Sequence, residues 1–350
     1  MTEQPLVSVV MSVYNAQDYL NEAIESILNQ SYENVEFIIV NDGSTDSSLN
    51  IIQSYMINDS RISLIDRKNK GLPFSLNEGI NIAKGKYIAR MDADDISLPT
   101  RIEEQVSFLD SHQNIGICGS WVEVFGGRTG FIKHPISHEE MKMKMLFNVC
   151  FAHPTVMIRK DLFETKNIKY NVSYSNSQDY MLWSEIQSIT CMANIPKILL
   201  RYRISEGSIG SLTDKSKSNA RYNLIKPIYS KFLKELNVVN VQHEDQLHFI
   251  LSEKTRIQEQ KLDLKKVDEY LNKILCTNVH KGNKYRYLLS LLSFKFVAVV
   301  LFQHQIGHST LSKAIFYRLF YIGLFYILVN KTVSRMNEFK YYINRKLFKC

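Results

Sequence analysis

The sequence has few cysteines: five among 350 residues, with no Cys-x-x-Cys pair. An odd number without regular spacing favours neither a disulfide framework nor a zinc site, so we expect a reducing compartment, the cytosol. The first five residues carry no lysine or arginine, and the apolar run Val7–Val13 is short and rich in β-branched residues. This run is not typical of a secretory signal peptide and instead predicts a buried strand.

Long uncharged apolar runs are also missing. Tyr287–Phe302 and Leu311–Val329 are apolar and aromatic, but Lys295 and Arg318 interrupt them. Neither segment therefore reaches about eighteen uncharged residues in a row, and we do not expect membrane-spanning helices. Basic residues follow at Lys331, Arg335, Lys340, Arg345, Lys346 and Lys349. They favour an amphipathic helix at the anionic inner face of the cell membrane, with a helical cap or a dimer face as the alternative.

The composition allows a packed core and more than one unit. Hydrophobic residues make up 45% of the 350 residues, enough for one catalytic domain and a smaller appendage. The formal net charge of +8 indicates an anionic ligand or an anionic surface. We find no internal repeat and no long low-complexity tract, and we expect no nucleic-acid partner.

Strand-like and helix-like segments alternate in the first two hundred residues. The predicted strands are Val7–Tyr14, Val35–Val40, Arg61–Ile65, Lys86–Met91 and Ile115–Phe125. The predicted helices follow Asp18, cover Ser47–Tyr55 and Ser75–Ala83, and begin again at Pro99 and Ser137. Such alternation predicts an α/β fold with a mostly parallel sheet covered on both faces, whose ligands bind beyond the carboxyl ends of the strands.

The pattern changes after about residue 212. Helical periodicity dominates Asn219–Leu236, Gln242–Gln258 and Leu262–Leu275, and the polar stretch Ser211–Ser218 lacks apolar periodicity. We therefore predict a catalytic domain over residues 1–212 and a helical, aromatic and basic region over residues 213–350.

Three carboxylates gather after the strand Lys86–Met91, at Asp92, Asp94 and Asp95. Three acids within four residues repel one another unless a cation or solvent screens them. Oxygen ligands select magnesium or manganese, which commonly leave coordination positions for substrate phosphates. The cluster predicts a divalent metal with a diphosphate as co-ligand, and a solvated acidic turn before the helix at Pro99 is the alternative.

A second acidic turn, Asn41–Ser44, follows the strand Val35–Val40. Gly43 permits a tight turn there, and the carboxylate of Asp42 can accept a hydrogen bond from a base or a ribose. Taken alone, the tetrapeptide is equally typical of a helix-capping turn.

The order of these motifs is more informative than any one of them. Ser12, Tyr14 and Asn15 follow the first strand, Asn41–Ser44 the second, and Ile88–Asp95 spans the fourth. This order resembles glycosyltransferase family 2, and Ile88–Asp95 is similar to bacterial capsule and O-antigen transferases. The resemblance covers about residues 5–205. It implies the GT-A fold and sugar transfer from a nucleotide-sugar donor, expected to be UDP-linked, to an acceptor hydroxyl in cell-surface polysaccharide synthesis.

The resemblance also implies roles for individual residues. Nucleotide contacts fall to Ser12, Tyr14, Asp42, Lys70 and Asp92, and a Mn²⁺ or Mg²⁺ ion to Asp94 and Asp95. Asp179 matches the family's base, which removes the proton of the acceptor hydroxyl while the anomeric configuration inverts. The expected acceptor is a glycan or a lipid-linked acceptor. The chain is expected to be cytoplasmic, with peripheral contact to the inner face of the cell membrane, and a homo-oligomer is a further expectation.

The sequence departs from the family pattern in two places. Gln178 replaces the first acid of a frequent Glu-Asp pair, and Ile204 or Ser205 stands where a histidine often follows Tyr-Arg. The Gln-x-x-Arg-Trp signature of processive synthases is missing, which favours addition of single sugars. His153 is expected to be structural, and Trp183 to lie in the core or the acceptor wall.

Two other classes of protein are alternatives to this interpretation. A sugar-phosphate nucleotidyltransferase usually has a glycine-rich basic loop after the first strand, where this sequence has Ser12–Asn15. A catalytically silent scaffold of a glycan assembly complex would be expected to lose metal or base residues, yet Asp94 and Asp179 are both present.

Overall fold

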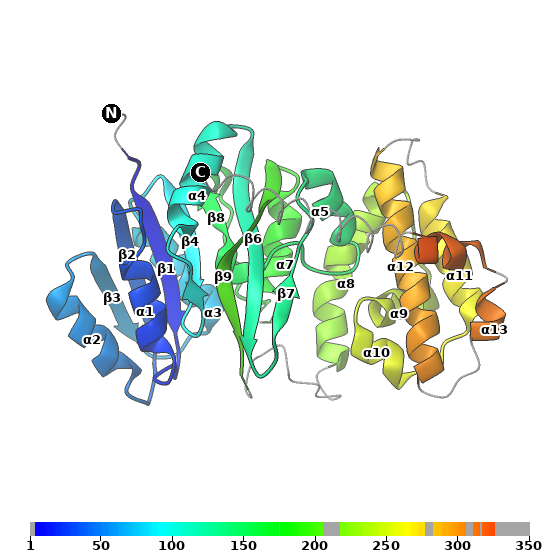
Figure 1. Cartoon of the computed structure of the whole chain (residues 1–350), viewed down its shortest axis with the longest axis horizontal. Coiled ribbons are helices and arrows are strands. Elements are labelled where there is room, and N and C mark those ends of the chain that lie inside the picture. The colour runs from blue at the N-terminus through cyan, green and yellow to red at the C-terminus, as the bar shows by residue number, and fades with distance from the viewer. Residues whose placement is uncertain are drawn as a thin grey trace, which may run out of the picture. The chain divides into compact units, whose positions relative to one another are not determined.

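The computed structural model describes residues 4–174, 176–205, 218–276, 283–305, 311–315 and 317–325. It divides the chain into two compact units (Figure 1). The first comprises Met1–Met145 and Val149–Ile228, and the second comprises Leu146–Asn148 and Tyr229–Cys350. The boundary that we predicted between residues 212 and 213 lies outside the described residues.

A nine-stranded sheet forms the centre of the first unit, in the order β3-β2-β1-β4-β8-β6-β9-β5, with β7 paired to β6. Strands β3, β2, β1 and β4 are mutually parallel, as are β6 and β9. The prediction of a mostly parallel α/β sheet is therefore confirmed. The strands are β1 Val7–Val13, β2 Val35–Asp42, β3 Ile62–Arg67, β4 Tyr87–Asp92, β5 Ile96–Ser97, β6 Ile115–Gly126, β7 Gly130–Ile132, β8 Met157–Arg159 and β9 Cys191–Ile204.

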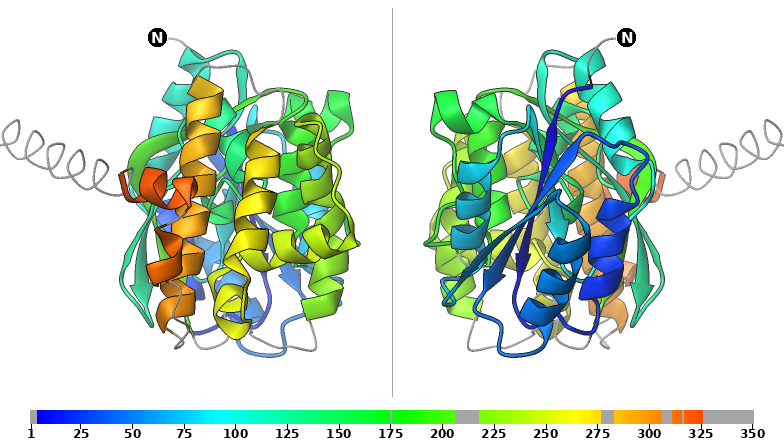
Figure 2. Two further views of the ribbon diagram at one scale, coloured as in Figure 1. Left: turned by 90° about the vertical axis from the view of Figure 1, so that its right-hand side faces the viewer. Right: turned by 90° about the vertical axis from the view of Figure 1, so that its left-hand side faces the viewer.

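Helices lie on both faces of this sheet, as the right-hand view of Figure 2 shows for its N-terminal half. They are α1 Leu20–Leu28, α2 Ser48–Asn58, α3 Leu72–Ile82, α4 Arg101–Ser111, α5 His138–Lys144, the 3-10 helix η1 His153–Thr155, α6 Asp161–Lys166 and α7 Gln178–Ile186. Helix α3 begins three residues before the predicted Ser75, with Pro73 in its first turn. It packs closely on β1, because a Cβ atom at Gly79 would lie 2.5 Å from Cγ1 of Val10.

The core of the first unit follows from the apolar strands. Val7, Val9, Met11 and Val13 of the central strand β1 are fully buried. Burial of each such side chain contributes roughly 1.5–3 kcal/mol relative to exposure. Helices that cover both faces of the sheet explain why β1 is an apolar run rather than an alternating pattern.

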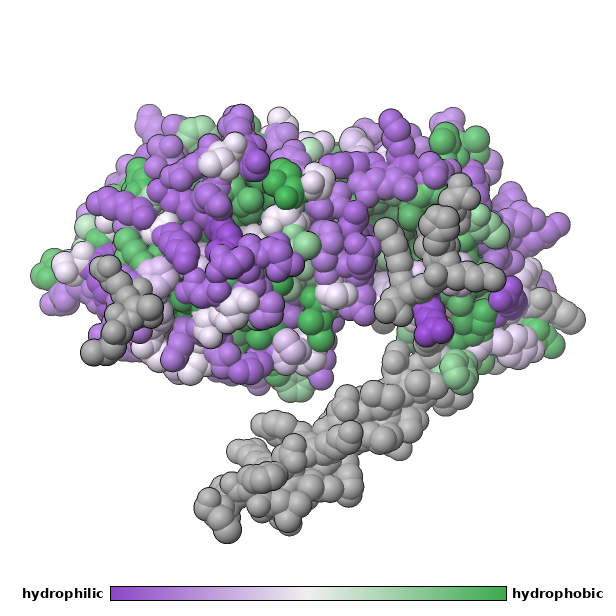
Figure 3. Space-filling model, turned by 90° about the horizontal axis from the view of Figure 1, so that it is seen from above, coloured by the Kyte–Doolittle hydropathy of each residue, from purple (hydrophilic) through white to green (hydrophobic). Residues whose placement is uncertain are grey.

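In the face shown in Figure 3, hydrophilic residues predominate and hydrophobic residues lie in small groups among them.

The second unit is helical in its described residues. Helix α8, Ser218–Glu235, enters it from the first unit, and the other helices are α9 Gln242–Leu251, α10 Lys254–Glu259, α11 Leu264–Leu275, α12 Asn283–Gln305 and α13 Leu311–Ala314. The predicted helix Gln242–Gln258 is two helices, because the helical conformation is interrupted at Ser252 and Glu253. Much of the predicted segment Leu311–Val329 and all of the basic residues after it lie outside the described residues.

Helix α12 is the core helix of the second unit. Its segment Tyr285–Gln305 is long and apolar enough to cross a membrane by length and composition. Within the unit, Leu292 and Phe296 are fully buried. The Lys295 ammonium, which interrupts the apolar run, donates to the Leu251 carbonyl at 2.7 Å, and the Gln303 amide donates to the Ile257 carbonyl at 2.7 Å. These contacts pack part of the helix within the unit, and 39% of its apolar window is buried, so the expectation that the chain has no membrane-spanning helix stays a prediction.

His248 explains why Leu146–Asn148 belong to the second unit. Its ring stacks with Phe147 and Tyr229 at centroid distances of 4.5 Å and 4.3 Å. Nε2 lies 2.6 Å from the Leu146 carbonyl, which can only accept, so Nε2 carries the proton and Nδ1 accepts from the Tyr270 hydroxyl. Burial lowers the pKa of His248 to about 4, so the ring is neutral at physiological pH.

Candidate active site

The sequence motifs meet at the carboxyl edge of the parallel strands. Strand β1 lies between β2 and β4, and its register pairs Ser12 with Val40 on one side and with Asp92 on the other. Tyr14 lies just beyond the end of β1 and is 54% exposed. The structure therefore brings Ser12 and Asp92 into neighbouring positions and leaves the ring of Tyr14 open to a ligand.

Polar side chains tie the loop after β1 to the loop after β2. Asn15 has a left-handed backbone with φ of 50°, and its amide donates to the Ser44 hydroxyl at 3.0 Å. Its side-chain oxygen accepts from the Thr45 amide at 2.8 Å, and the Ala16 amide donates to the Ser48 hydroxyl at 2.9 Å. Thr45 and Ser48 were not among the residues predicted for the site, although a serine and threonine run before a helix signals such contacts.

The Asp42 carboxylate has protein donors on both oxygens, and its side chain is 3% exposed. It forms an ion pair with Arg67, its Oδ1 accepts from the Lys70 amide at 2.8 Å, and its Oδ2 accepts from the Gly71 amide at 2.9 Å. Arg67 in turn donates to the Ser75 hydroxyl at 2.9 Å. Asp42 thus holds the loop before α3 against the end of β2, and its predicted contact with a base stays a prediction.

The Lys70 side chain belongs to the same loop. Its ammonium lies 4.3 Å from the centre of the Phe74 ring, an exposed cation–π contact worth about 0.5–1 kcal/mol. Such a weak contact leaves the ammonium free to turn toward an anionic ligand at little cost.

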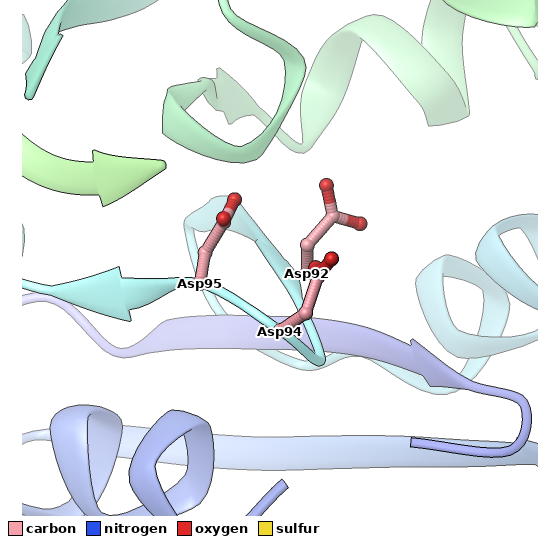
Figure 4. A group of neighbouring side chains, drawn as sticks. All are labelled: Asp92, Asp94 and Asp95. Carbon is pink, nitrogen blue, oxygen red and sulfur yellow. The ribbon is translucent and has the colours of Figure 1, made fainter. Parts of the chain in front are cut away.

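The three acids after β4 form one cluster. Ligand oxygens of Asp92, Asp94 and Asp95 lie within 4.8 Å of one another, and Figure 4 shows the side chains directed to the same side of the turn. Asp92 pairs with the buried Arg90. Asp95 is 1% exposed; its Oδ1 accepts from the Arg203 amide at 2.8 Å, and its Oδ2 has no hydrogen-bond partner among the described residues.

The electrostatics of this cluster are unbalanced. Burial, followed by repulsion from Asp92, raises the pKa of Asp94. Burial, followed by repulsion from Asp92 and Asp94, raises the pKa of Asp95 further. The charges of Arg90 and Arg203 oppose the rise at Asp94, but Arg203 also pairs with Glu22, so the two arginines do not supply enough positive charge to keep three neighbouring carboxylates ionised. An all-oxygen donor set with an unpartnered buried oxygen fits a divalent cation such as Mg²⁺ or Mn²⁺.

Asp179 lies in the first turn of α7. Burial raises its pKa, and the opposing contributions come from the Tyr180 amide, which donates to Oδ1 at 2.7 Å, and from the charge of Arg90. The Tyr170 hydroxyl interacts electrostatically with Arg90, Asp179 and Asp92. The predicted base and the acidic cluster therefore share one neighbourhood around Arg90.

Arg90 was not among the residues predicted for the site. It is a charged residue within the apolar strand β4, and a charge in such a run is the signal that could have found it. Arg101, also fully buried, donates to the carbonyls of Arg90 and Pro154 at 3.2 Å and 2.7 Å. This second arginine holds the backbone beneath the cluster in place.

His153 forms part of the wall beside Arg90. Its Nε2 lies 2.9 Å from the Tyr170 hydroxyl oxygen, and its ring meets Trp183 edge to face at 5.9 Å. Burial, followed by the charge of Arg90, lowers the pKa of His153. The neutral His153 therefore positions Tyr170, and the fully buried Trp183 packs against His153.

Known proteins are similar to this chain in sequence, and solved structures are similar to it in fold. The family model for glycosyl transferase family 2 matches residues 8–165. An uncharacterized glycosyltransferase of Haemophilus influenzae is 34% identical over 273 residues, covering 72% of this chain and 84% of the relative. The O-antigen biosynthesis glycosyltransferase WbnJ of Escherichia coli is 33% identical over 243 residues, covering 67% of this chain and 92% of WbnJ.

Solved structures show the fold at low sequence identity. Residues 1–349 of S. aureus TarS in complex with UDP-GlcNAc superpose with a TM-score of 0.58 at 16% identity, covering 86% of this chain and 89% of that chain. The mannosyltransferase PcManGT of Pyrobaculum calidifontis, in complex with GDP-Man and Mn²⁺, gives 0.52 at 13% identity, covering 88% and 89%. The GT-A fold that the resemblance implied is confirmed. This chain belongs to glycosyl transferase family 2 and is a glycosyltransferase.

Proposed function

We propose that this glycosyltransferase is metal-dependent and inverting, and that it moves a sugar from a UDP-linked donor to an acceptor hydroxyl during cell-surface polysaccharide synthesis. The observation that carries the proposal is the charge-unbalanced cluster of Asp92, Asp94 and Asp95 at the end of β4. The UDP-GlcNAc complex of TarS, the Mn²⁺ complex of PcManGT and the O-antigen role of WbnJ support it by similarity.

Asp94 and Asp95 are the proposed metal ligands, and Asp92 shares its charge between the metal site and Arg90. When bound, the ion would neutralise the negative charge that grows on the leaving nucleoside diphosphate as the glycosidic bond breaks. Magnesium and manganese both suit these oxygen ligands.

The nucleotide is proposed to bind along the ends of β1 and β2. The exposed ring of Tyr14 offers a stacking surface for the base, and Ser12 lines the floor beside Asp92. Asp42 is proposed to bind the nucleotide while it holds the loop of Lys70, whose ammonium can approach the diphosphate. Each of these side chains thus acts from a position fixed by neighbouring strands.

Asp179 is the proposed base. It would accept the proton of the acceptor hydroxyl as that oxygen attacks the anomeric carbon from the side opposite the leaving diphosphate, which inverts the configuration without a covalent intermediate. Burial raises the pKa of Asp179 from its ordinary value and so brings it closer to working pH. Arg90 opposes the rise and helps to keep the carboxylate ionised.

Thermal-shift binding tests this proposal. UDP, GDP, CDP and dTDP would each be added with and without Mn²⁺ to the wild type, to Asp94→Ala, and to the exposed-acid control Asp18→Ala. We expect one nucleotide, UDP, to stabilise the wild type and the control in a manganese-dependent way, and this stabilisation to vanish in Asp94→Ala. Absence of any manganese-dependent stabilisation would contradict the proposal.

We also propose that the chain acts in the cytoplasm at the inner face of the cell membrane, where a lipid-linked acceptor is available. Tyr321 and Phe325 are 56% and 62% exposed, Arg318 beside them is exposed, and the sequence after them is basic. Co-sedimentation of the full chain with phosphatidylglycerol vesicles, but not with phosphatidylcholine vesicles, is the expected result. A dimer in sedimentation without vesicle binding would favour a homo-oligomer face instead.

A further inference from the structure

One face of the sheet formed by β6, β7 and β9 carries exposed aromatic and charged side chains. The buried Val122, Val124 and Leu200 occupy the opposite, core face of these strands. Cross-strand pairing aligns Phe131 of β7 with Glu123 of β6, and Glu123 with Arg201 of β9. We call the set of Trp121, Phe125, Phe131, Lys133 and Arg201 the aromatic platform; Phe131 and Lys133 are exposed, and the other three are half-buried.

The rings of the platform have defined surroundings. The Trp121 indole donates to the His134 carbonyl at 3.0 Å, and the Lys133 ammonium lies 5.0 Å from its ring centre. The Arg201 guanidinium lies 4.4 Å from the centre of the Phe125 ring. Phe131, in contrast, is 62% exposed, although a large apolar ring gains free energy when it is removed from water. An uncovered ring between two ring-backed cations is an arrangement that favours a ligand with both apolar and anionic groups.

The charge of the platform selects among ligands. Glu123 is the only acid in residues 115–133, and it pairs with Arg201 at 3.2 Å. Lys133 and the exposed Arg128 in the turn between β6 and β7 leave an excess of positive charge. A second copy of this face would therefore be repelled, whereas an anionic ligand would be attracted.

The platform also adjoins the acidic cluster. Phe125 lies 4.4 Å from the Arg203 guanidinium, and Nε of Arg203 donates to the Asp94 carbonyl at 2.8 Å. Trp121 and Phe125 are four residues apart on one strand, a span of about 13 Å, which is long enough for more than one sugar ring. A chain bound on the platform would therefore extend toward the turn that carries the metal ligands.

We propose that the aromatic platform binds an anionic segment of the acceptor glycan, with Phe131 stacking on a sugar ring and Lys133 and Arg201 contacting carboxylate or phosphate groups. This inference rests on the proposed function, because it names the chemical class of the acceptor. It predicts binding that weakens as salt is added, since the charge contacts are exposed.

The test measures binding of the full chain to polygalacturonate, to neutral dextran and to phosphatidylglycerol vesicles by biolayer interferometry. The double variant Phe131→Gln with Lys133→Gln removes one ring and one charge from the platform. Its matched control is Ile57→Gln with Lys84→Gln, which removes an exposed apolar group and a charge elsewhere in the first unit. The UDP and Mn²⁺ thermal shift is measured on each protein.

We expect the wild type to prefer polygalacturonate to dextran, the platform variant to lose about tenfold in affinity, and the control to match the wild type. Equal binding by the platform variant and the wild type, no binding to polygalacturonate, or a loss confined to vesicles would each overturn the proposal. The thermal shift with UDP and Mn²⁺ separates the proposed function from the proposed glycan site. Absence of this shift in the wild type contradicts the proposed function, whereas the binding of polygalacturonate alone tests the aromatic platform.

Discussion

Two strands of the sheet end in aspartate, and the surroundings of these aspartates are opposite. At the end of β2, Asp42 accepts from an arginine side chain and from two backbone amides. At the end of β4, Asp92 pairs with the buried Arg90, and the second nearby arginine, Arg203, also pairs with Glu22. One oxygen of Asp95 has no partner among the described residues. The first site is complete within the protein, and the second is short of positive charge.

The comparison shows that the position of an acid at a strand end does not by itself define its function. A carboxylate with charged and amide donors stabilises the native loop, and removing it leaves those donors buried without a partner. A cluster with too few donors opposes folding while it is ionised, unless a ligand brings a positive charge. We therefore expect substitutions at the two sites to change stability in opposite directions.

The greatest loss is expected at Asp179, a half-buried carboxylate that shares Arg90 and Tyr170 as electrostatic neighbours with the acidic cluster. Asp179→Asn should lower kcat by about a thousandfold, because a base contributes about 10²–10⁴-fold to rate. Sugar transfer is measured with the donor nucleotide that the thermal shift identifies. Asp161→Asn, on an exposed position of α6, is the control. A loss smaller than tenfold would mean that Asp179 is not the base.

The next largest effect is expected at Asp42, whose hydrogen-bond donors all come from the protein. Asp42→Asn should lower the free energy of unfolding by about 3 kcal/mol, since it leaves Arg67, 12% exposed, with one of its two carboxylate partners lost. Urea unfolding of the wild type, Asp42→Asn and the exposed control Asp18→Asn measures the difference. If Asp42→Asn and Asp18→Asn unfold alike, the ion pair with Arg67 is not stabilising.

The pH dependence of the rate gives a smaller effect. Because burial raises the pKa of Asp179, the base becomes protonated at a higher pH than an ordinary aspartate. The rate should therefore fall as pH decreases, with a midpoint above the ordinary aspartate pKa of about 3.9. A profile of kcat/KM against pH, recorded at saturating Mn²⁺, checks this. A rate that stays constant down to that value would contradict the raised pKa.

The smallest effect is expected at the acidic cluster after β4, which is short of positive charge. Asp94→Asn should raise the free energy of unfolding of the metal-free protein by on the order of 1 kcal/mol at neutral pH, because it removes one of the repelling charges. The sign follows from the raised pKa of Asp94: its contribution to stability is lost as pH rises through the pKa of the folded state. A destabilised Asp94→Asn protein in metal-free buffer would show that the cluster is already balanced.

The sequence was sufficient to predict the strands that position the site. Strands β1, β2 and β4 are apolar runs that end in polar motifs, so the strands and their common carboxyl edge followed from the pattern, whereas their order in the sheet did not. The partner of Asp42 did not follow, because Arg67 lies 25 residues away and only the register of β2 with β3 brings it near. The electrostatic contact between Asp179 and Tyr170 did not follow either, because it depends on the tertiary structure and not on a periodic pattern.

In the second unit, too, the local sequence pattern did not predict the tertiary contacts. Apolar periodicity continues across Ser252 and Glu253, so it predicted one helix where the chain forms α9 and α10. The packing of Lys295 on the Leu251 carbonyl depends on how α12 lies against that break. Local pattern therefore predicts the elements, whereas the partners of charged groups require the tertiary structure.

The most direct test of the account compares thermal unfolding of Asp42→Asn and Asp94→Asn in metal-free buffer and in saturating Mn²⁺. We predict that Asp42→Asn unfolds at a lower temperature than the wild type yet keeps the full Mn²⁺-dependent rise. Asp94→Asn should unfold at or above the wild-type temperature without metal and lose that rise. Two results would contradict this difference between Asp42, whose donors come from the protein, and the acidic cluster, which is short of positive charge. They are equal destabilisation of both variants in metal-free buffer, and an intact Mn²⁺ response in Asp94→Asn.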